Sequence, residues 1–323
     1  MSSRRPLLLV ALSAACFAVM ALAAKLASAR LSGSEVAFVR FVFMLVPVLA
    51  VPRLARKAVE FERLDLLLYR GVFGGLAVLF YFLAIAHIPV GLATLLTYSA
   101  PIWSVSFAAL FLGEPADRGL LLPMATAFMG MVLAAGGRHP GDPAGAFFHF
   151  GRWEALGVAS SILSGAAYAA IRAARRTESS WAVYGSFSLC GLLASAPFAL
   201  PGFVRPTLRE WLLLLAVGVF SVAAQLLMTY AYRWVTNLQA GVLSQLTVVL
   251  SIAFGAIFLG DRPTPLQALG SLLTLAGVVG VVRGQAKGLL LQTSESAAGP
   301  VPAEAQAEDA RLERPEAGSI HSR

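Results

Sequence analysis

Charge is the scarcest property of this chain, because only 13% of its 323 residues are Asp, Glu, Lys or Arg. A soluble protein carries about 25% charged residues. Hydrophobic residues make up 58% of this chain, and its mean hydropathy is +0.75. A soluble fold has no way to hide this much apolar surface from water. The composition therefore excludes a soluble protein and predicts one whose solvent is lipid.

Cysteine and histidine are also rare. The two cysteines, Cys16 and Cys190, lie inside apolar segments, which favours small core residues over a disulfide or a metal pair. The four histidines lack the spacing of metal ligands. Only His139, Asp142 and His149 share one loop, and the glycines and prolines around them favour a linker over a metal site. We therefore expect no metal or other cofactor.

The chain also lacks the motifs and charges that would drive transport or bind nucleic acid. It has no Walker-type phosphate loop, so no ATP drive lies within it. Its net charge of +8 is typical of the basic cytoplasmic loops of membrane proteins, so we expect no nucleic-acid partner. No acidic residue falls in the middle third of an apolar segment, where proton pumps usually need one. This favours a facilitator or exchanger over a strongly proton-coupled pump.

What the chain does contain is a series of apolar segments near the 20 or so residues that a helix needs to cross a bilayer. Charged or Gly/Pro-rich breaks separate the segments. They cover residues 6–24, 34–52, 66–86, 90–112, 119–136, 153–173, 181–200, 211–232, 238–259 and 265–282. The pattern predicts an all-α integral membrane protein with ten transmembrane helices.

A long internal repeat organises these segments. Tyr81–Glu114 recurs without a gap as Met228–Asp261, at an offset of 147 residues, and both copies end in Phe-Leu-Gly and an acid. Each repeat holds five spans, an odd number, so the second copy must enter the membrane upside down. Inverted repeats are typical of secondary transporters, whose two halves surround a midplane site and expose it alternately.

The repeat sets the expected domain boundaries. They are a first repeat over 6–136, a connecting loop over 137–152, a second repeat over 153–282 and a disordered cytoplasmic tail over 283–323. More lysines and arginines fall in loops on the side of the N-terminus than on the other side. Both termini are therefore expected in the cytoplasm, with the chain in the plasma (inner) membrane.

Several short motifs resemble a known family. They are Glu35–Arg40 at the start of the second segment, the stretch from Leu83 to Pro101, Phe111–Glu114, and Phe258–Asp261 as its second copy. Over about residues 6–282 the chain resembles an EamA-type member of the drug/metabolite transporter superfamily, with two EamA repeats. The resemblance implies a ten-helix basket around a central cavity, and the export or exchange of a small organic solute by alternating access.

The resemblance also bears on partners and on rival functions. It implies a small organic solute as ligand and lipid as surroundings, and the complete pair of repeats makes an ATPase subunit unexpected. An integral membrane enzyme acting on lipid is the alternative, but the loops lack the clustered acids or the nucleophile and base that it needs. The second repeat has Val248 in place of Pro101 and Phe187 in place of Arg40, so a symmetric site is not expected.

Two arginines lie within predicted spans. Arg40 is about six residues into the second segment, roughly 9 Å below the boundary. At that depth a charge usually faces a cavity or a partner. Arg40 therefore either attracts an anionic group of the substrate, or pairs with Glu35 or helix-end carbonyls. Arg70 is only about one turn inside the third segment, so we expect its side chain to reach the cytoplasmic surface.

Uncharged polar and aromatic side chains gather in the repeat-equivalent fourth and ninth segments. Tyr98, Ser99 and Trp103 lie in the fourth, Gln245 occupies the position of Tyr98 in the ninth, and Gln225 lies in the eighth. Such groups either line a cavity, where amides orient a ligand and aromatics contact its apolar parts, or bond between helices. Together with Arg40 they form the predicted substrate-binding site.

Overall fold

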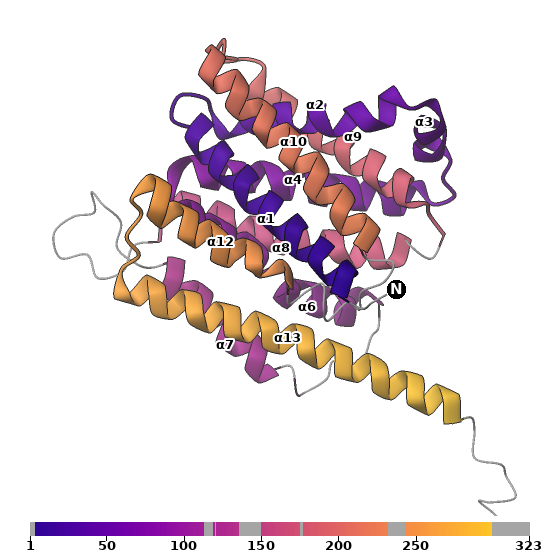
Figure 1. Cartoon of the computed structure of the whole chain (residues 1–323). Coiled ribbons are helices and arrows are strands. Elements are labelled where there is room, and N and C mark those ends of the chain that lie inside the picture. Colours follow the sequence, from indigo (N-terminus) through magenta and orange to yellow (C-terminus); the bar gives the residue numbers. More distant parts are fainter. Residues whose placement is uncertain are drawn as a thin grey trace, which may run out of the picture.

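The computed structural model describes residues 4–112, 119, 121–135, 150–174, 177–231 and 243–298, and these contain helices and no strand. The helices form a bundle whose long members cross one another at an angle (Figure 1). They are α1 (Arg4–Ala27), α2 (Gly33–Ala50), α3 (Pro52–Val59), α4 (Leu64–His87), α5 (Val90–Tyr98), α6 (Ala100–Leu112), α7 (Leu121–Ala135), α8 (Arg152–Ala174), α9 (Ser180–Ala199), α10 (Leu208–Ala231), α12 (Leu246–Phe254), the π-helix η2 (Gly255–Leu259) and α13 (Pro265–Ala298).

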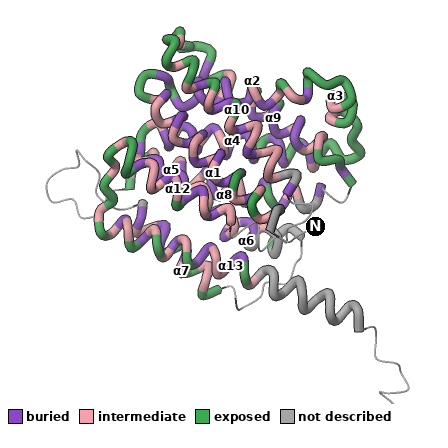
Figure 2. The backbone as a smooth tube through the Cα atoms, in the orientation of Figure 1, coloured by how far each residue is buried: buried purple, intermediate pink, exposed green. Residues whose placement is uncertain are grey.

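Seven of the described helices are long and apolar enough to cross a membrane: α1, α2, α4, α8, α9, α10 and the first part of α13. Two shorter apolar helical segments, Leu121–Ala134 and Leu246–Leu259, accompany them. Buried residues fill the centre of the bundle, and exposed ones lie toward its rim (Figure 2). Many exposed side chains are large and apolar, such as Leu122 (77% exposed), as a lipid-facing surface requires. The chain is therefore a multi-pass all-α membrane protein.

The segment expected as one span over 90–112 is divided into α5 and α6 at Ser99. Pro101 has no N–H to donate to the carbonyl of Thr97, and its ring crowds that carbonyl. The chain instead makes a tight turn in which the Ser99 N–H donates to the Leu96 carbonyl (3.2 Å). Broken helices are a recurring feature of transporter binding sites.

The equivalent segment in the other half of the molecule is also broken, although no proline lies at that break. Gln245 forms a turn before α12 begins at Leu246, and valine stands at position 248. The helix then changes to the π-helix η2 and ends at Gly260, whose φ of 70° lies in the left-handed region that favours glycine. Proline is therefore one cause of such a break and not a requirement for it.

One helix was not expected from the sequence, and another is longer than expected. The connection between the second and third segments contains α3, with Pro52 at its first turn, and the Ser179 hydroxyl at the start of α9 donates to the Lys57 carbonyl of α3 (3.0 Å). α13 continues to Ala298, beyond the end expected at 282, and runs out past the body of the bundle (Figure 1).

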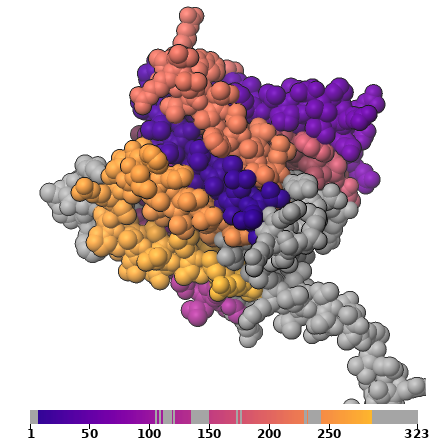
Figure 3. All heavy atoms as spheres, in the orientation of Figure 1, coloured from indigo at the N-terminus to yellow at the C-terminus, as the bar shows by residue number. Residues whose placement is uncertain are grey.

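The packing of the helices is reciprocal between the N-terminal half (α1–α7) and the C-terminal half (α8–α13). α1 packs along α10 and α4 along α8, while α2 faces α9 and α7 faces α13. On the face in Figure 3, α1 lies between α10 and α12, so the halves interlock and do not stand side by side.

Two hydrogen bonds repeat this reciprocity at atomic detail. The Ser13 hydroxyl of α1 donates to the Ala224 carbonyl of α10 (2.7 Å), and the Ser160 hydroxyl of α8 donates to the Ala77 carbonyl of α4 (2.7 Å). Residue 160 follows 13, and residue 224 follows 77, by the same 147 positions as the sequence repeat. Each half therefore holds the other through the same pair of positions.

Candidate functional site

Arg40 lies in the second turn of α2 and is only 4% exposed. Its Nε–H donates to the Ser221 hydroxyl of α10 (3.0 Å), which joins the two halves. Its guanidinium carbon is 5.2 Å from the centre of the Phe41 ring and 5.7 Å from that of Phe82. The buried Nη1 has no hydrogen-bond partner among the described residues. A permanent positive charge is thus held inside an aromatic wall by one hydroxyl.

Glu35, one of the alternative partners considered for Arg40, bonds elsewhere. Its carboxylate accepts the Ser32 N–H (2.6 Å) in a capping box at the start of α2, and it also accepts the Val204 N–H. No described acidic side chain lies within ion-pair distance of Arg40. The alternative in which Arg40 pairs with Glu35 is therefore wrong.

Arg70 does not reach the surface, so the expectation that it extends to water is also wrong. It is 8% exposed, and its guanidinium carbon sits 4.2 Å from the centre of the Phe187 ring of α9. Gly74 lies one turn further along α4, and a Cβ there would overlap the Arg70 Nη1. The absent side chain leaves room for the guanidinium to turn into the bundle. Its buried Nε finds no hydrogen-bond partner within the described part of the chain.

Phe187 connects the two arginines. Its ring centre is 4.2 Å from the Arg70 guanidinium carbon and 6.0 Å from that of Arg40, and it meets the Phe41 ring edge to face. Position 187 is the repeat equivalent of position 40. The residue that replaces the arginine in the second repeat therefore lies against the arginine of the first.

Three tyrosines lie in the neighbourhood of the Arg40 guanidinium. Tyr98, Tyr81 and Tyr184 lie close enough to interact with it electrostatically. The Tyr81 hydroxyl bonds to that of Thr94 (2.9 Å), whereas no described residue bonds to the buried Tyr184 hydroxyl. Tyr98 therefore lies near Arg40 as the sequence predicts, and Tyr81 and Tyr184 join them.

The other predicted site residues are Ser99, Trp103, Gln225 and Gln245. Ser99 and Trp103 use their polar atoms within the protein: the Ser99 hydroxyl donates to the Leu95 carbonyl (2.9 Å), and the Trp103 Nε1–H donates to the Ser161 hydroxyl of α8 (2.8 Å). Gln225 lies one turn after Ser221 on α10, on the face that meets Arg40.

Gln245 lies at the break before α12, and its side chain is 6% exposed. The hydroxyl of Thr247, two residues later, lies near Tyr98 of α5, although it makes no hydrogen bond of ordinary geometry. The ends of the two broken helices therefore meet through Tyr98 and Thr247.

Sequence reasoning missed Arg70, Phe187 and Ser221 as members of this site. Phe187 carried a signal, because its repeat equivalence to Arg40 predicts that the two meet if the repeats are related by a two-fold axis. Arg70 carried a weaker one, as a charge inside an apolar segment. Ser221 carried none, since a lone serine in a span usually bonds to its own helix or a neighbour.

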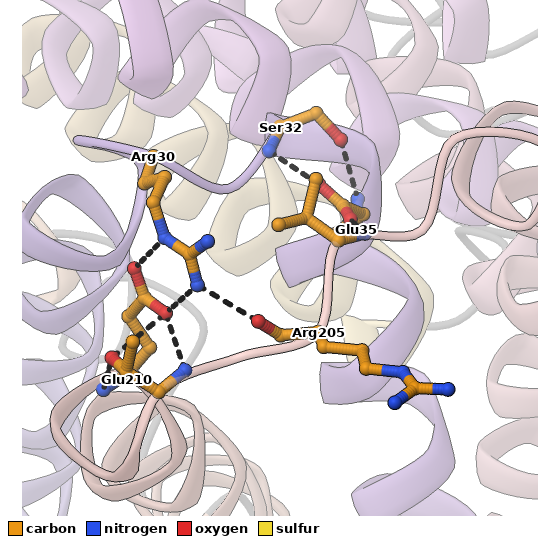
Figure 4. A network of polar contacts seen from close by, with 7 residues as sticks. Arg30, Ser32, Glu35, Arg205 and Glu210 are labelled. Atoms are coloured by element: carbon orange, nitrogen blue, oxygen red, sulfur yellow. Dashed lines mark hydrogen bonds and ion pairs between the residues drawn. The ribbon is translucent and has the colours of Figure 1, made fainter.

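One end of the bundle holds a different set of charges, the loop cluster of Arg30, Ser32, Glu35, Arg205 and Glu210 (Figure 4). Arg30 Nε–H donates to the Glu210 carboxylate (2.7 Å), and Nη2–H donates to the Arg205 carbonyl (2.8 Å). The hydrogen bond to Glu210 raises the pKa of the Arg30 guanidinium. The cluster ties the α1–α2 turn to the α9–α10 loop.

Lys25 and Asp261 lie where the α4–α5 turn meets the end of η2. The Lys25 ammonium donates to the Ile88 carbonyl (2.9 Å). Burial raises the pKa of the Asp261 carboxyl, while the Lys25 ammonium and the Val90 N–H oppose that shift. No group of three or more potential metal ligands occurs in the described part of the chain. His139, Asp142 and His149 fall outside it.

Comparison with known proteins identifies the family of this bundle. The model of the EamA-like transporter family matches residues 4–136 and again residues 151–283. The chain belongs to the EamA-like transporter family. It is therefore a transporter of small metabolites and not an enzyme, and the family resemblance seen in the sequence is confirmed. The lipid-enzyme alternative is not supported.

Relatives of this EamA-like transporter include named exporters. It is 30% identical over 277 residues to the pseudopaline exporter CntI of Pseudomonas aeruginosa, covering 85% of this chain and 95% of that protein. It is 29% identical over 200 residues to a "Probable terminal-alkyne amino-acid exporter" of Streptantibioticus cattleyicolor, covering 60% and 64%. A crystal structure with 21% identity and a TM-score of 0.57, covering 88% of this chain and 98% of its own, shares the fold.

Proposed function

We propose that this EamA-like transporter exports a small organic metabolite across the plasma membrane by alternating access. The two exporters among its relatives support export over uptake. In this proposal ten transmembrane helices form two inverted repeats, and both termini lie in the cytoplasm. The substrate binds between the repeats, at a cavity lined by Arg40, Tyr98, Gln225 and Gln245, with Ser99 and Trp103 supporting its wall.

The reciprocal packing supports the inverted arrangement. If two equivalent halves are related by a two-fold axis, every contact from the first half to the second has a counterpart with the roles exchanged. The bonds Ser13–Ala224 and Ser160–Ala77 form such a pair. So do the contacts of Arg40 with Ser221 and of Phe187 with Gly74, because both partners again shift by 147 positions.

The observation that carries the proposed site is Arg40. A buried cation without an acidic partner among the described residues is costly in a membrane protein and is usually functional. It lies next to the break between α5 and α6, near Tyr98, and it bonds to the other half through Ser221. That place suits a site that closes and opens when the halves move relative to each other.

Metabolite profiling of cells and medium, with and without the gene, tests export directly. We expect at least one small compound to accumulate in the medium only when the protein is expressed, and to remain in the cells when it is absent. A pair of profiles with no difference, despite normal amounts of protein in the membrane, would remove the proposal.

A further inference from the structure

We infer that Arg70 and Arg40 form one binding site for a substrate that carries two negative charges, either as two carboxylates or as a phosphate group. The inference rests on the proposed function and names the chemical class of the substrate at the same site. Arg70 is the new member, because the sequence alone places it at the surface.

The two arginines come from different helices and lie against the same ring. Arg40 belongs to α2 and Arg70 to α4. Both guanidinium groups face the ring of Phe187, and they lie close enough to repel each other electrostatically. No acidic side chain among the described residues lies within ion-pair distance of either. An anion between them would remove the repulsion.

Unused donors point to where such an anion binds. Arg40 gives its Nε–H to Ser221, and its buried Nη1 has no partner among the residues that the structure describes; the same holds for the buried Nε of Arg70. Each guanidinium therefore keeps N–H groups available for a planar carboxylate or for phosphate oxygens, which arginine binds through paired hydrogen bonds. The Tyr184 hydroxyl, which is buried and has no partner in the described ranges, adds a further polar group near Arg40.

The aromatic wall defines the rest of the substrate. Phe41, Phe82 and Phe187 surround the guanidinium of Arg40 and offer ring faces without hydrogen-bonding groups. A compact organic body would lie against them, with its anionic groups on the two arginines. This favours small dicarboxylates, acidic amino acids and phosphate esters over neutral or cationic solutes.

A purely structural role for Arg70, as a cation stacked on Phe187, makes a different prediction. If the stack is structural, Arg70→Met lowers the melting temperature of the purified protein. If Arg70 belongs to a binding site, Met removes an unpaired buried charge while filling a similar volume, so the melting temperature without ligand stays equal or rises. A clear fall in melting temperature, together with unchanged responses to anions, would overturn the inference.

The binding test uses the purified full-length protein in detergent, with thermal unfolding measured at constant ionic strength in sodium chloride. The probes are L-glutamate and L-glutamine, which match in size and differ by one negative charge, together with succinate, citrate and inorganic phosphate. We expect at least one doubly charged probe to raise the melting temperature of the wild type, and L-glutamine to leave it unchanged. If no anion raises the melting temperature above its value in sodium chloride alone, the inference is wrong.

Variants then assign the effect to the arginines. Arg70→Gln and Arg40→Gln should each weaken binding of the active anion by about tenfold or more. Arg70→Lys should restore part of it, because lysine keeps the charge and loses the planar fork. Arg53→Gln, on the exposed α3, is the matched control and should bind as the wild type does. An equal loss of anion binding in Arg53→Gln, or no loss in Arg70→Gln, would contradict the inference that the two arginines form one site.

This outcome is separable from that of the export experiment. Export of a compound that has neither two carboxylates nor a phosphate group would overturn the two-charge inference and leave the proposed export intact. Anion binding by the arginine pair without any exported compound would remove the proposed export and leave the two-charge inference intact.

Discussion

Charged side chains at the end of the bundle and in its middle have opposite surroundings. In the loop cluster, Arg30 bonds to both oxygens of Glu210, and Glu35 accepts two backbone N–H groups. In the middle, Arg40 and Arg70 have aromatic neighbours and no acidic partner among the described residues. The paired charges hold loops together, whereas in our proposal the two buried arginines bind the substrate.

Replacing Arg40 tests the buried side of this comparison and should have the largest effect. Arg40→Gln should lower export of the profiled compound by about tenfold to hundredfold, as expected when hydrogen bonds to a charge worth about 1.5–3 kcal/mol are lost. The rate of appearance in the medium measures it, normalised to the amount of protein in the membrane. Arg53→Gln is the control, and equal export by Arg40→Gln and wild type would remove Arg40 from the site.

Replacing Glu210 tests the role given to the loop cluster. Glu210→Gln removes the ion pair with Arg30, so thermal unfolding of the purified protein should begin a few degrees lower. The preference between L-glutamate and L-glutamine should stay as in the wild type, because the cluster does not contact the substrate. A changed preference with an unchanged melting temperature would reverse the roles given to the two regions.

The matched serines test the reciprocity of the halves with smaller effects. Ser13→Ala removes one buried interhelical hydrogen bond and should lower the free energy of unfolding by about 0.6–1 kcal/mol. Ser160→Ala removes the equivalent bond and also the bond that the Ser160 hydroxyl accepts from the Thr97 hydroxyl (3.2 Å), so its loss should be at least as large. Denaturant unfolding measures them, and a loss confined to one serine would argue against equivalent halves.

The smallest effect concerns pH and Asp261. Its pKa is raised by burial in the folded protein, so its contribution to stability is fully present below the unfolded pKa of about 4 and is lost as the pH rises through the folded value. Asp261→Asn removes this titration and should flatten the change of melting temperature with pH in that window. Identical pH profiles for variant and wild type would contradict the assigned pKa direction.

The sequence predicts the architecture better than the site because the two depend on different physics. Apolar length and an odd-numbered repeat are properties of the chain itself, and they led directly to a helical membrane transporter. The turn of Arg70 into the bundle depends on space left by Gly74 and on a ring from α9, which no local pattern encodes. The capping box of Glu35 likewise took away the partner expected for Arg40.

The helix breaks show the same limit within a single element. Pro101 gives a local reason for the break at Ser99, so that break was open to prediction, although the segment was expected to stay one span. The turn at Gln245 has no proline, and it depends on how α12 packs against α5 and α1. Sequence alone identifies Tyr98 and Gln245 as equivalent positions, and only the structure brings Thr247 to Tyr98.

Exchange in reconstituted vesicles tests the central claim most directly. Vesicles containing only the purified protein are loaded with the exported compound, and entry of the labelled compound is followed without ATP or an imposed pH gradient. A carrier with one site between two halves predicts faster entry into loaded vesicles than into empty ones, and loss of that difference in Arg40→Gln. A rate of entry that is the same in loaded and empty vesicles, and the same in Arg40→Gln as in the wild type, would contradict the central claim.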